Sequence, residues 1–468
     1  MDGESRDDRV DGLLTGRHKW ITLGGVLLII ASGFEVVAVS VTMPTIVRDL
    51  NSLSWYSAGF SVTIAVSILG IVLAGPWGDQ KGPKAPLYTG VVSCVIGLVA
   101  AGSAHTMALF LIGRAIQGLG IGLINVSVYV IVGRELPKHL HAKMFSLTAV
   151  GWILPALLGP IVAGILVDTV GWRWAFWGVA PIMVIASIIL YPGFATEGGA
   201  ATDNMSMQEW RGRMFRAVLI ACAVGAIQPV GETVKDGHLT WAIVGVVALL
   251  ALTLAASRQL LPPHALILGR GLPALVSSRL FLAGTYFAFE VYIPLMGQTF
   301  RGLSPTKAGL VVASGAITWA IASALQTKIV DEQLRPKFLT AGMVLVIVGI
   351  AGATTLVEPT IPLIVPVLCW AVAGFGIGVA YPLASVMLLS MSEPSRIGWN
   401  SSALSMSEQI GTSTSLALGG VFFGALVGQG MLTAILAYCA IPLLYGIFGI
   451  VAASRTRPEA VTPDLRLD

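Results

Sequence analysis

Three glutamates and one arginine lie inside long apolar stretches of the sequence, where charged residues are rare. Glu35, Glu290 and Glu408 each fall within a stretch of membrane-spanning length, and Arg114 is the one basic residue that we place inside such a stretch. A charge at the centre of a bilayer costs about 2.5–3.5 kcal/mol on insertion scales, so these side chains should face a cavity or a partner. A carboxyl group binds a proton more tightly when it is buried than when it lies beside a cation or water. The four residues are therefore candidates for proton coupling, with Arg114 as the cation that modulates Glu35.

A structural role is the alternative for each of these groups. A glutamate in a span can cap a neighbouring helix or form a fixed ion pair, and Arg114 can be a static link between spans. Glu408 can also form a polar cluster with its neighbours Ser407 and Gln409. The sequence alone leaves both roles open.

The composition sets the class of protein. The 468 residues are 55% hydrophobic and only 11% charged, with a mean hydropathy of +0.84, whereas ordinary globular domains carry about 25% charged residues. This indicates an integral membrane protein. The net charge of +4 is spread over many loops, so no nucleic acid is expected as a partner. The histidines fall in tails, loops or span ends and the four cysteines lie far apart, so we predict no metal and no cofactor.

About fourteen apolar stretches are long enough to span a membrane. They cover roughly residues 20–44, 54–75, 86–104, 107–132, 145–167, 174–194, 215–230, 239–256, 280–297, 308–324, 338–356, 361–389, 402–427 and 432–452. An even number places both termini on one side, and that side is predicted to be cytoplasmic because most Lys and Arg residues lie in its loops. The predicted fold class is all-α integral membrane.

The stretches are arranged as six, two and six, with polar segments around the middle pair. This predicts an N-terminal six-helix bundle in residues 1–195, a linker with two accessory transmembrane helices in 196–262, and a C-terminal six-helix bundle in 263–468. An acid followed by basic residues recurs in the loops at 79–84 and 331–337, which supports two related halves.

The fifth stretch carries an unusual combination of proline and glycine. Pro155 and the pair Gly159-Pro160 are followed by Gly164. Proline removes a helix hydrogen bond and bends the helix, while glycine lets a neighbouring helix approach closely. A bend of this kind is tolerated in a bilayer where another helix packs against it.

Four segments of the first half resemble the motifs of the major facilitator superfamily. They are residues 35–44, 75–84, 111–120 and 155–164. The first and last resemble the first-span and antiporter motifs of its fourteen-span drug:proton antiporters. Glu35 replaces the usual aspartate, Pro155 stands where glycine is usual, and Ala163 replaces one glycine. The resemblance implies two six-helix bundles that rock around a central cavity, a proton-relay role for Arg114, and a seal against leakage at 155–164.

The resemblance also assigns a role to residues 75–84. It implies a conformational-switch loop made by Gly75, Asp79, Gly82 and Lys84, in which Asp79 pairs across the two halves and latches the cytoplasmic side shut. Simple positive-inside topology is the alternative for the lysines of this loop.

The function predicted from these residues is proton-coupled export of amphipathic, drug-like or cationic small molecules. The sequence has no phosphate-binding loop of the form G-x-x-x-x-G-K-[ST], so the proton gradient is the expected energy source. The apolar setting of Glu290 suits selection of a cationic substrate. Aromatic and polar residues expected to line the cavity are Gln117, Phe289, Tyr292, Phe375 and Tyr381.

Other functions fit the same spans. Export of a native lipid, siderophore or metabolite is not separated from drug export by the sequence, while a membrane receptor or enzyme is disfavoured because no nucleophile motif or soluble domain is present. The expected partners are the substrate, protons and membrane lipid. We expect a monomer in the cell membrane.

Overall fold

The computed structural model describes residues 12–194, 207–233, 239–329, 331–393 and 396–456. Within these ranges the regular structure is helical, without a strand. The helices are α1 (His18–Asp49), α2 (Ala58–Lys81), α3 (Lys84–Gly102), α4 (Met107–Glu135), α5 (Lys138–Thr169), α6 (Trp174–Trp177), α7 (Val179–Leu190), α8 (Met207–Glu232), α9 (Leu239–Ser257), α10 (Leu272–Glu290), α11 (Ile293–Arg301), α12 (Pro305–Gln326), α13 (Arg335–Ala353), α14 (Ile364–Met391), α15 (Ile397–Leu426) and α16 (Met431–Ser454).

The prediction of a polytopic membrane protein is confirmed. Thirteen helical segments of the described residues are long and apolar enough to cross a membrane. The 30-residue helix α15 is as long as the others but carries a run of Ser and Thr residues, and it is the fourteenth crossing that the sequence predicts. Short breaks divide two of the crossings, between α6 and α7 and between α10 and α11.

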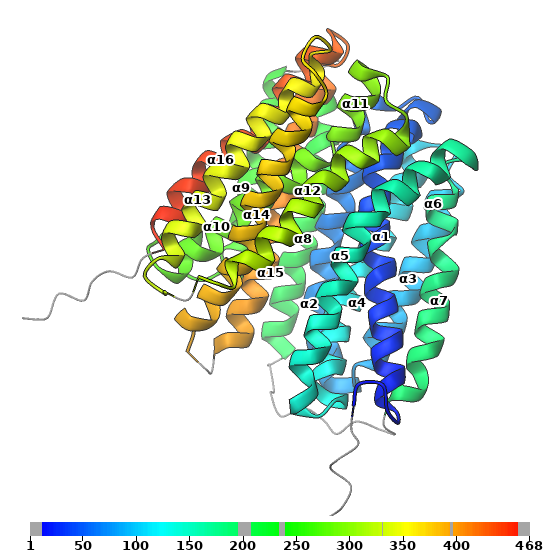
Figure 1. Ribbon diagram of the computed structural model, residues 1–468, viewed down its shortest axis with the longest axis vertical. Coiled ribbons are helices and arrows are strands. Elements are labelled where there is room, and N and C mark those ends of the chain that lie inside the picture. The colour runs from blue at the N-terminus through cyan, green and yellow to red at the C-terminus, as the bar shows by residue number, and fades with distance from the viewer. Residues whose placement is uncertain (1–11, 195–206, 234–238, 330, 394–395, 457–468) are drawn as a thin grey trace, which may run out of the picture.

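The helices form two bundles that lie side by side (Figure 1). In the N-bundle, α1–α7, the largest contacts join α3 to α4, α2 to α4 and α1 to α5. In the C-bundle, α10–α16, they join α13 to α14, α12 to α14 and α10 to α15. A helix in lipid satisfies its own backbone hydrogen bonds, so packing between helices is what fixes this arrangement.

The accessory helices α8 and α9 differ in their surroundings. Helix α8 packs against α2 of the N-bundle and α15 of the C-bundle, whereas the main contact of α9 is α8. The accessory pair therefore does not stand apart from the bundles, because α8 lies along the seam between them.

One predicted span begins too late. The sequence predicts a crossing over residues 280–297, but α10 begins at Leu272 and the crossing continues through α11 to Arg301. The prediction stopped at Arg279 because a charge was taken as the edge of the span. Arg279 instead lies inside the C-bundle, 5% exposed, so Arg114 is not the only basic residue within a span.

The bundles meet at one end of the molecule. We call the face where α1 begins and α16 ends the terminal face, and the opposite face, where α1 ends and α2 begins, the distal face. The main contacts between bundles join α5 to α12, α2 to α15 and α1 to α11. Tyr56 donates a hydrogen bond to the Val291 carbonyl at 2.6 Å, and the hydroxyls of Ser57 and Tyr292 lie 2.6 Å apart. These contacts close the distal face.

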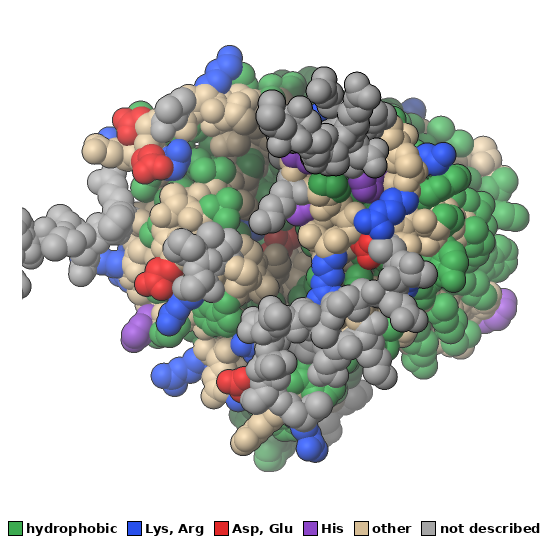
Figure 2. Space-filling view, turned by 90° about the horizontal axis from the view of Figure 1, so that it is seen from below, with side chains coloured by type: hydrophobic (Ala, Val, Ile, Leu, Met, Phe, Trp, Pro, Cys, Tyr) green, Lys and Arg blue, Asp and Glu red, His purple; other side chains and the backbone are tan. Residues whose placement is uncertain are grey.

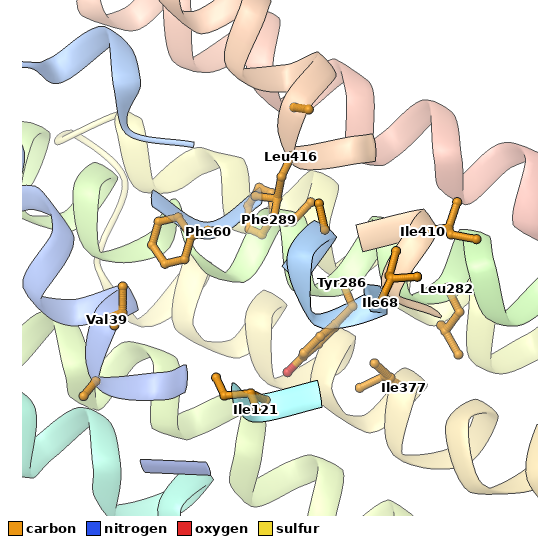
Figure 3. Close-up of a cluster of buried hydrophobic side chains, with 14 of the residues drawn as sticks. Val39, Phe60, Ile68, Ile121, Leu282, Tyr286, Phe289, Ile377, Ile410 and Leu416 are labelled. Carbon is orange, nitrogen blue, oxygen red and sulfur yellow. The ribbon is translucent and has the colours of Figure 1, made fainter. Parts of the chain in front are cut away.

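The terminal face is more open. The bundles diverge toward this end in Figure 1, and Figure 2, which views the molecule from below, shows a hollow near the centre of the face with acidic side chains inside it. Deeper in the molecule, buried apolar side chains from both bundles fill the interior (Figure 3). The molecule is therefore described in a state open toward the terminal face.

Candidate functional site

A buried ion pair joins α1 and α4 in the N-bundle. Glu35 lies near the middle of α1 and its Oε1 accepts a hydrogen bond from Nη1 of Arg114. The same Nη1 donates to Oε1 of Gln117 at 2.7 Å, and Nε donates to the Gly59 carbonyl at 2.9 Å. The exposed fractions of Glu35, Arg114 and Gln117 are 1%, 3% and 0%. The carboxylate, the amide and the carbonyl thus all accept hydrogen bonds from the guanidinium.

One oxygen of the Glu35 carboxylate lacks a hydrogen-bond partner among the described residues. In the described part of the chain, Oε2 of Glu35 and Nε2 of Gln117 are buried and have no hydrogen-bond partner. Arginine does not deprotonate, so the guanidinium of Arg114 stays charged beside this carboxyl group.

A second ion pair lies in the C-bundle, and sequence reasoning found only half of it. Arg279 of α10 donates from Nε to Oε2 of Glu408 on α15, at 3.2 Å. The Tyr381 hydroxyl on α14 donates to the same oxygen at 2.8 Å, and the Tyr381 carbonyl accepts from Nη1 of Arg279 at 2.6 Å. The expected cluster of Glu408 with Ser407 does not form, since the Ser407 hydroxyl donates to Leu404 of its own helix.

A signal for Arg279 was present in the sequence. The residues on both sides of it, 272–278 and 280–290, form one uninterrupted apolar helix, and a single arginine does not end a span when a carboxylate lies opposite. Looking for a cation to match Glu408 would have found it.

Glu290 is the unpaired carboxylate. It is the last residue of α10, half-buried, and no ion pair or hydrogen bond joins it to another described residue. Its neighbours are aromatic: Tyr286 stacks on Trp370 with ring centroids 4.6 Å apart, and Tyr292 stacks on Tyr438 at 3.4 Å.

The proline–glycine segment of α5 meets the C-bundle through its backbone. A Cβ added to Gly164 would overlap the backbone of Thr306, and one added to Gly309 of α12 would overlap the carbonyl of Pro160. The Asp168 carboxylate also accepts a hydrogen bond from the Thr306 hydroxyl at 2.6 Å. Helices α5 and α12 therefore touch near the distal face, at positions where only glycine fits.

The comparisons with known proteins decide the family. The sequence profile described as Major Facilitator Superfamily matches residues 25–415. The chain belongs to the major facilitator superfamily.

Relatives within this superfamily include named drug exporters. Over 415 residues the chain is 27% identical to an uncharacterized MFS-type transporter of Mycobacterium tuberculosis, covering 85% of this chain and 58% of that protein. It is 25% identical to multidrug resistance protein 3 of Bacillus subtilis, covering 87% and 79%. It is 22% identical to a probable multidrug-efflux transporter of Mycobacterium tuberculosis, covering 92% and 93%.

Solved structures of the superfamily show the same fold. A D-xylose-proton symporter matches with a TM-score of 0.63 at 16% identity, covering 93% of this chain and 97% of that one. A bacterial homologue of the lysosomal transporter Spinster, in an inward-facing and unoccupied conformation, matches with a TM-score of 0.67 at 14% identity, covering 95% and 100%.

The segment predicted to be an antiporter motif, residues 155–164, lies in α5, and its glycines are not equivalent. A Cβ at Gly159 would lie 3.5 Å from Cβ of Val37, which is an ordinary contact. Pro155 packs against Gly33 of α1, where a Cβ would lie 3.2 Å from the Pro155 ring. In this state, therefore, Pro155 and Gly159 face the N-bundle, and Gly164 makes the close approach to the C-bundle.

The predicted switch loop is mostly helix. Helix α2 continues to Lys81, so Gly75 and Asp79 lie in its last turns, and Gly82, with a φ of 77°, ends it. Polar residues were read as a loop because they end the apolar run, but a helix can extend beyond the membrane. Lys84 begins α3 with its ammonium 5.1 Å from the Phe194 ring centroid. The Asp79 side chain lies outside the described residues, so its latch stays a prediction.

The residues predicted to line the cavity divide into two groups. Gln117, Phe289 and Tyr292 are fully buried, so they line no open cavity in this state. Phe375 and Tyr381 are half-buried. Gln117 accepts a hydrogen bond from Arg114, and Tyr381 donates one to Glu408. These two residues therefore belong to the two arginine–glutamate pairs.

Proposed function

We propose that this transporter is a proton-coupled exporter of amphipathic, predominantly cationic small molecules. The observation that carries the proposal is the pair of Glu35 and Arg114, buried in the N-bundle with one carboxylate oxygen lacking a partner. Several similar proteins carry names of multidrug exporters, which supports the substrate class.

The proposed cycle uses the two access states. The terminal face is taken as cytoplasmic because most Lys and Arg lie on that side. In the distal-open state, a proton from outside adds to Oε2 of Glu35. In the terminal-open state, the carboxylate loses that proton to the cytoplasm and attracts Arg114 again. The described state has a closed distal face and a Glu35–Arg114 contact, which suits the moment of substrate loading.

Glu290 is the proposed substrate-selecting residue. A half-buried carboxylate without a cationic partner among the described residues attracts a positively charged ligand, and its aromatic neighbours supply apolar contact. Glu408 is a second proton-coupling candidate, held by Arg279 and Tyr381. The proposed domains keep the predicted limits of 1–195, 196–262 and 263–468, and the transporter is proposed to act as a monomer.

The test is transport in proteoliposomes with an imposed pH gradient. A panel of cationic dyes, neutral analogues of similar size, lipids and metabolites is offered, and uptake and proton release are both measured. We expect cationic amphiphiles to be concentrated against their gradient with proton counterflow. Glu290→Gln should reduce the transport of cationic substrates more than that of neutral ones, whatever the size of the pH gradient. Transport that ignores the pH gradient would overturn the proton coupling, and equal loss for neutral compounds would overturn the role of Glu290.

A further inference from the structure

Helix α8 makes a buried polar contact with the N-bundle near the distal face. Gln228 lies within α8 and is 2% exposed. Its Nε2 donates a hydrogen bond of 2.6 Å to the carbonyl of Ser54, which lies just before α2 at the distal face. The hydrogen bond satisfies Nε2 of this buried amide, while its Oε1 has no hydrogen-bond partner among the described residues.

The same part of α8 packs closely against the C-bundle. A Cβ added to Gly420 of α15 would lie 3.0 Å from Oε1 of Gln228 and 2.7 Å from Cβ of Ser57. One added to Gly231 of α8 would lie 2.6 Å from the Val421 side chain. The three helices α2, α8 and α15 therefore meet at one point, and the absence of a side chain at Gly420 makes that meeting possible.

This meeting point adjoins the contacts that close the distal face. Ser57, which lies against Gly420, is also the residue whose hydroxyl bonds Tyr292 of the C-bundle. The neighbouring Tyr56 bonds the Val291 carbonyl. On the opposite side of the molecule, α5 and α12 touch directly through Gly164 and Gly309. The two contacts between the bundles are therefore closed differently. Helices α5 and α12 meet directly through their backbones, whereas α8 packs against both α2 and α15 where those two helices meet.

We propose that α8 is a working part of the distal gate and that Gln228 is the positioning residue through which the accessory pair stabilises the distal-closed state. When the distal ends of α2 and α15 separate, α8 cannot keep both the Ser54 hydrogen bond and the packing on Gly420 and Val421. Opening the gate must break one of them. The inference rests on the alternating access of the proposed function, but on neither its proton nor its substrate.

The experiment measures the gate directly, without substrate and at one fixed pH. Spin labels are placed at the exposed positions His105 of the N-bundle side and Gln429 of the C-bundle side, in a full-length background whose native cysteines are replaced by serine. Distances are recorded by pulsed electron paramagnetic resonance in lipid nanodiscs. Gln228→Leu removes the hydrogen bond and keeps the side-chain size. Val218→Leu, at a 40% exposed position of the same helix, is the matched control.

We expect the ratio of distal-open to distal-closed molecules to rise about threefold in Gln228→Leu, and up to about twentyfold, which is the range for interhelical hydrogen bonds in membranes. Val218→Leu should leave the ratio unchanged. Gly231→Ala adds a Cβ on α8 that would lie 2.6 Å from the Val421 side chain and touches only α15, so it should shift the ratio in the same direction even if Gln228→Leu lowers expression. An unchanged ratio in both Gln228→Leu and Gly231→Ala would overturn the proposal. Because neither protons nor drugs enter the measurement, failure here is distinct from failure of proton-coupled export.

Discussion

Each bundle holds one arginine–glutamate pair inside the membrane, and the two pairs are built in opposite senses. In the N-bundle the first helix supplies the carboxylate, Glu35, and the fourth supplies Arg114. In the C-bundle the first helix supplies the arginine, Arg279, and the carboxylate Glu408 comes from the fifth. In both, a backbone carbonyl from a third helix also accepts from the guanidinium.

The two pairs also differ in their access to water. The side chain of Glu35 is 1% exposed and that of Glu408 is 17% exposed. Glu35 is enclosed by protein in this state, whereas part of the Glu408 side chain is open to solvent. The two ion pairs therefore differ in burial, and we predict from this difference that the buried pair is the one coupled to the conformational cycle.

The largest effect should come from removing the cation of the N-bundle pair. Arg114→Met leaves the Glu35 carboxylate buried without a counter-charge, so we expect a loss of about 3–5 kcal/mol of stability and no export. Thermal unfolding in detergent measures the first and proteoliposome uptake the second. The double variant Glu35→Gln/Arg114→Met should recover part of the lost stability. If Arg114→Met is as stable as the parent protein, the buried Glu35 carboxylate does not depend on Arg114 for its stability.

The next effect concerns coupling. Glu35→Gln keeps the shape of the side chain and removes its titration, so uphill export driven by a proton gradient should fall to background while downhill exchange stays measurable. Glu408→Gln, at the more exposed pair, should only reduce uphill export. The measurement is substrate accumulation with and without a pH gradient. If Glu35→Gln still concentrates substrate, the coupling site moves to Glu408 or Glu290 and the comparison is reversed.

Arg279→Met repeats the first change in the C-bundle and should be milder. Glu408 is partly hydrated once the arginine is lost, so we expect a loss of roughly 1.5–3 kcal/mol, the range for hydrogen bonds to charged groups. Unfolding temperatures of Arg279→Met and Arg114→Met, measured side by side, test the difference. Equal losses in the two variants would mean that exposure does not set the cost.

The smallest change removes one hydrogen bond from the C-bundle pair. Tyr381→Phe keeps the ring beside Arg279 and deletes the hydroxyl that donates to Glu408, while the Arg279 contact remains. We therefore expect a loss of about 1.5 kcal/mol, at the bottom of the range for hydrogen bonds to charged groups, and a modest reduction in export. An effect as large as that of Arg279→Met would show that the tyrosine, and not the arginine, holds the carboxylate.

The sequence was sufficient for the fold class because apolar length is a local property of each span. It also located Glu35 and Arg114 inside spans, because a charge within an apolar stretch stands out; their role in proton coupling stays a prediction. It was insufficient for Arg279, whose placement depends on a carboxylate 129 residues away. A rule that ends a predicted span at its first charged residue gives the wrong boundary where that residue forms an ion pair inside the folded protein, as Arg279 does with Glu408.

Contacts between helices were the other part that the sequence could not supply. The motif drew attention to Gly159, yet the close approach in this state is made by Gly164, because the side of α5 that meets α12 depends on how the bundles are tilted. In the same way, no local pattern marks Gln228 of α8, since the carbonyl that it binds belongs to another bundle.

The contact of Gly164 with Thr306 and of Gly309 with Pro160 bears on the speed of the transport cycle. Each turnover must part and re-form this contact if the distal face opens. Side chains that interlock must be frozen into single rotamers every time two surfaces meet, which costs conformational entropy. Glycine has no side-chain rotamers, so no rotamer entropy is lost at Gly164 and Gly309 when α5 and α12 come into contact. We therefore expect a larger residue at Gly164 or Gly309 to slow the closing of the α5–α12 contact, even where its side chain can be accommodated.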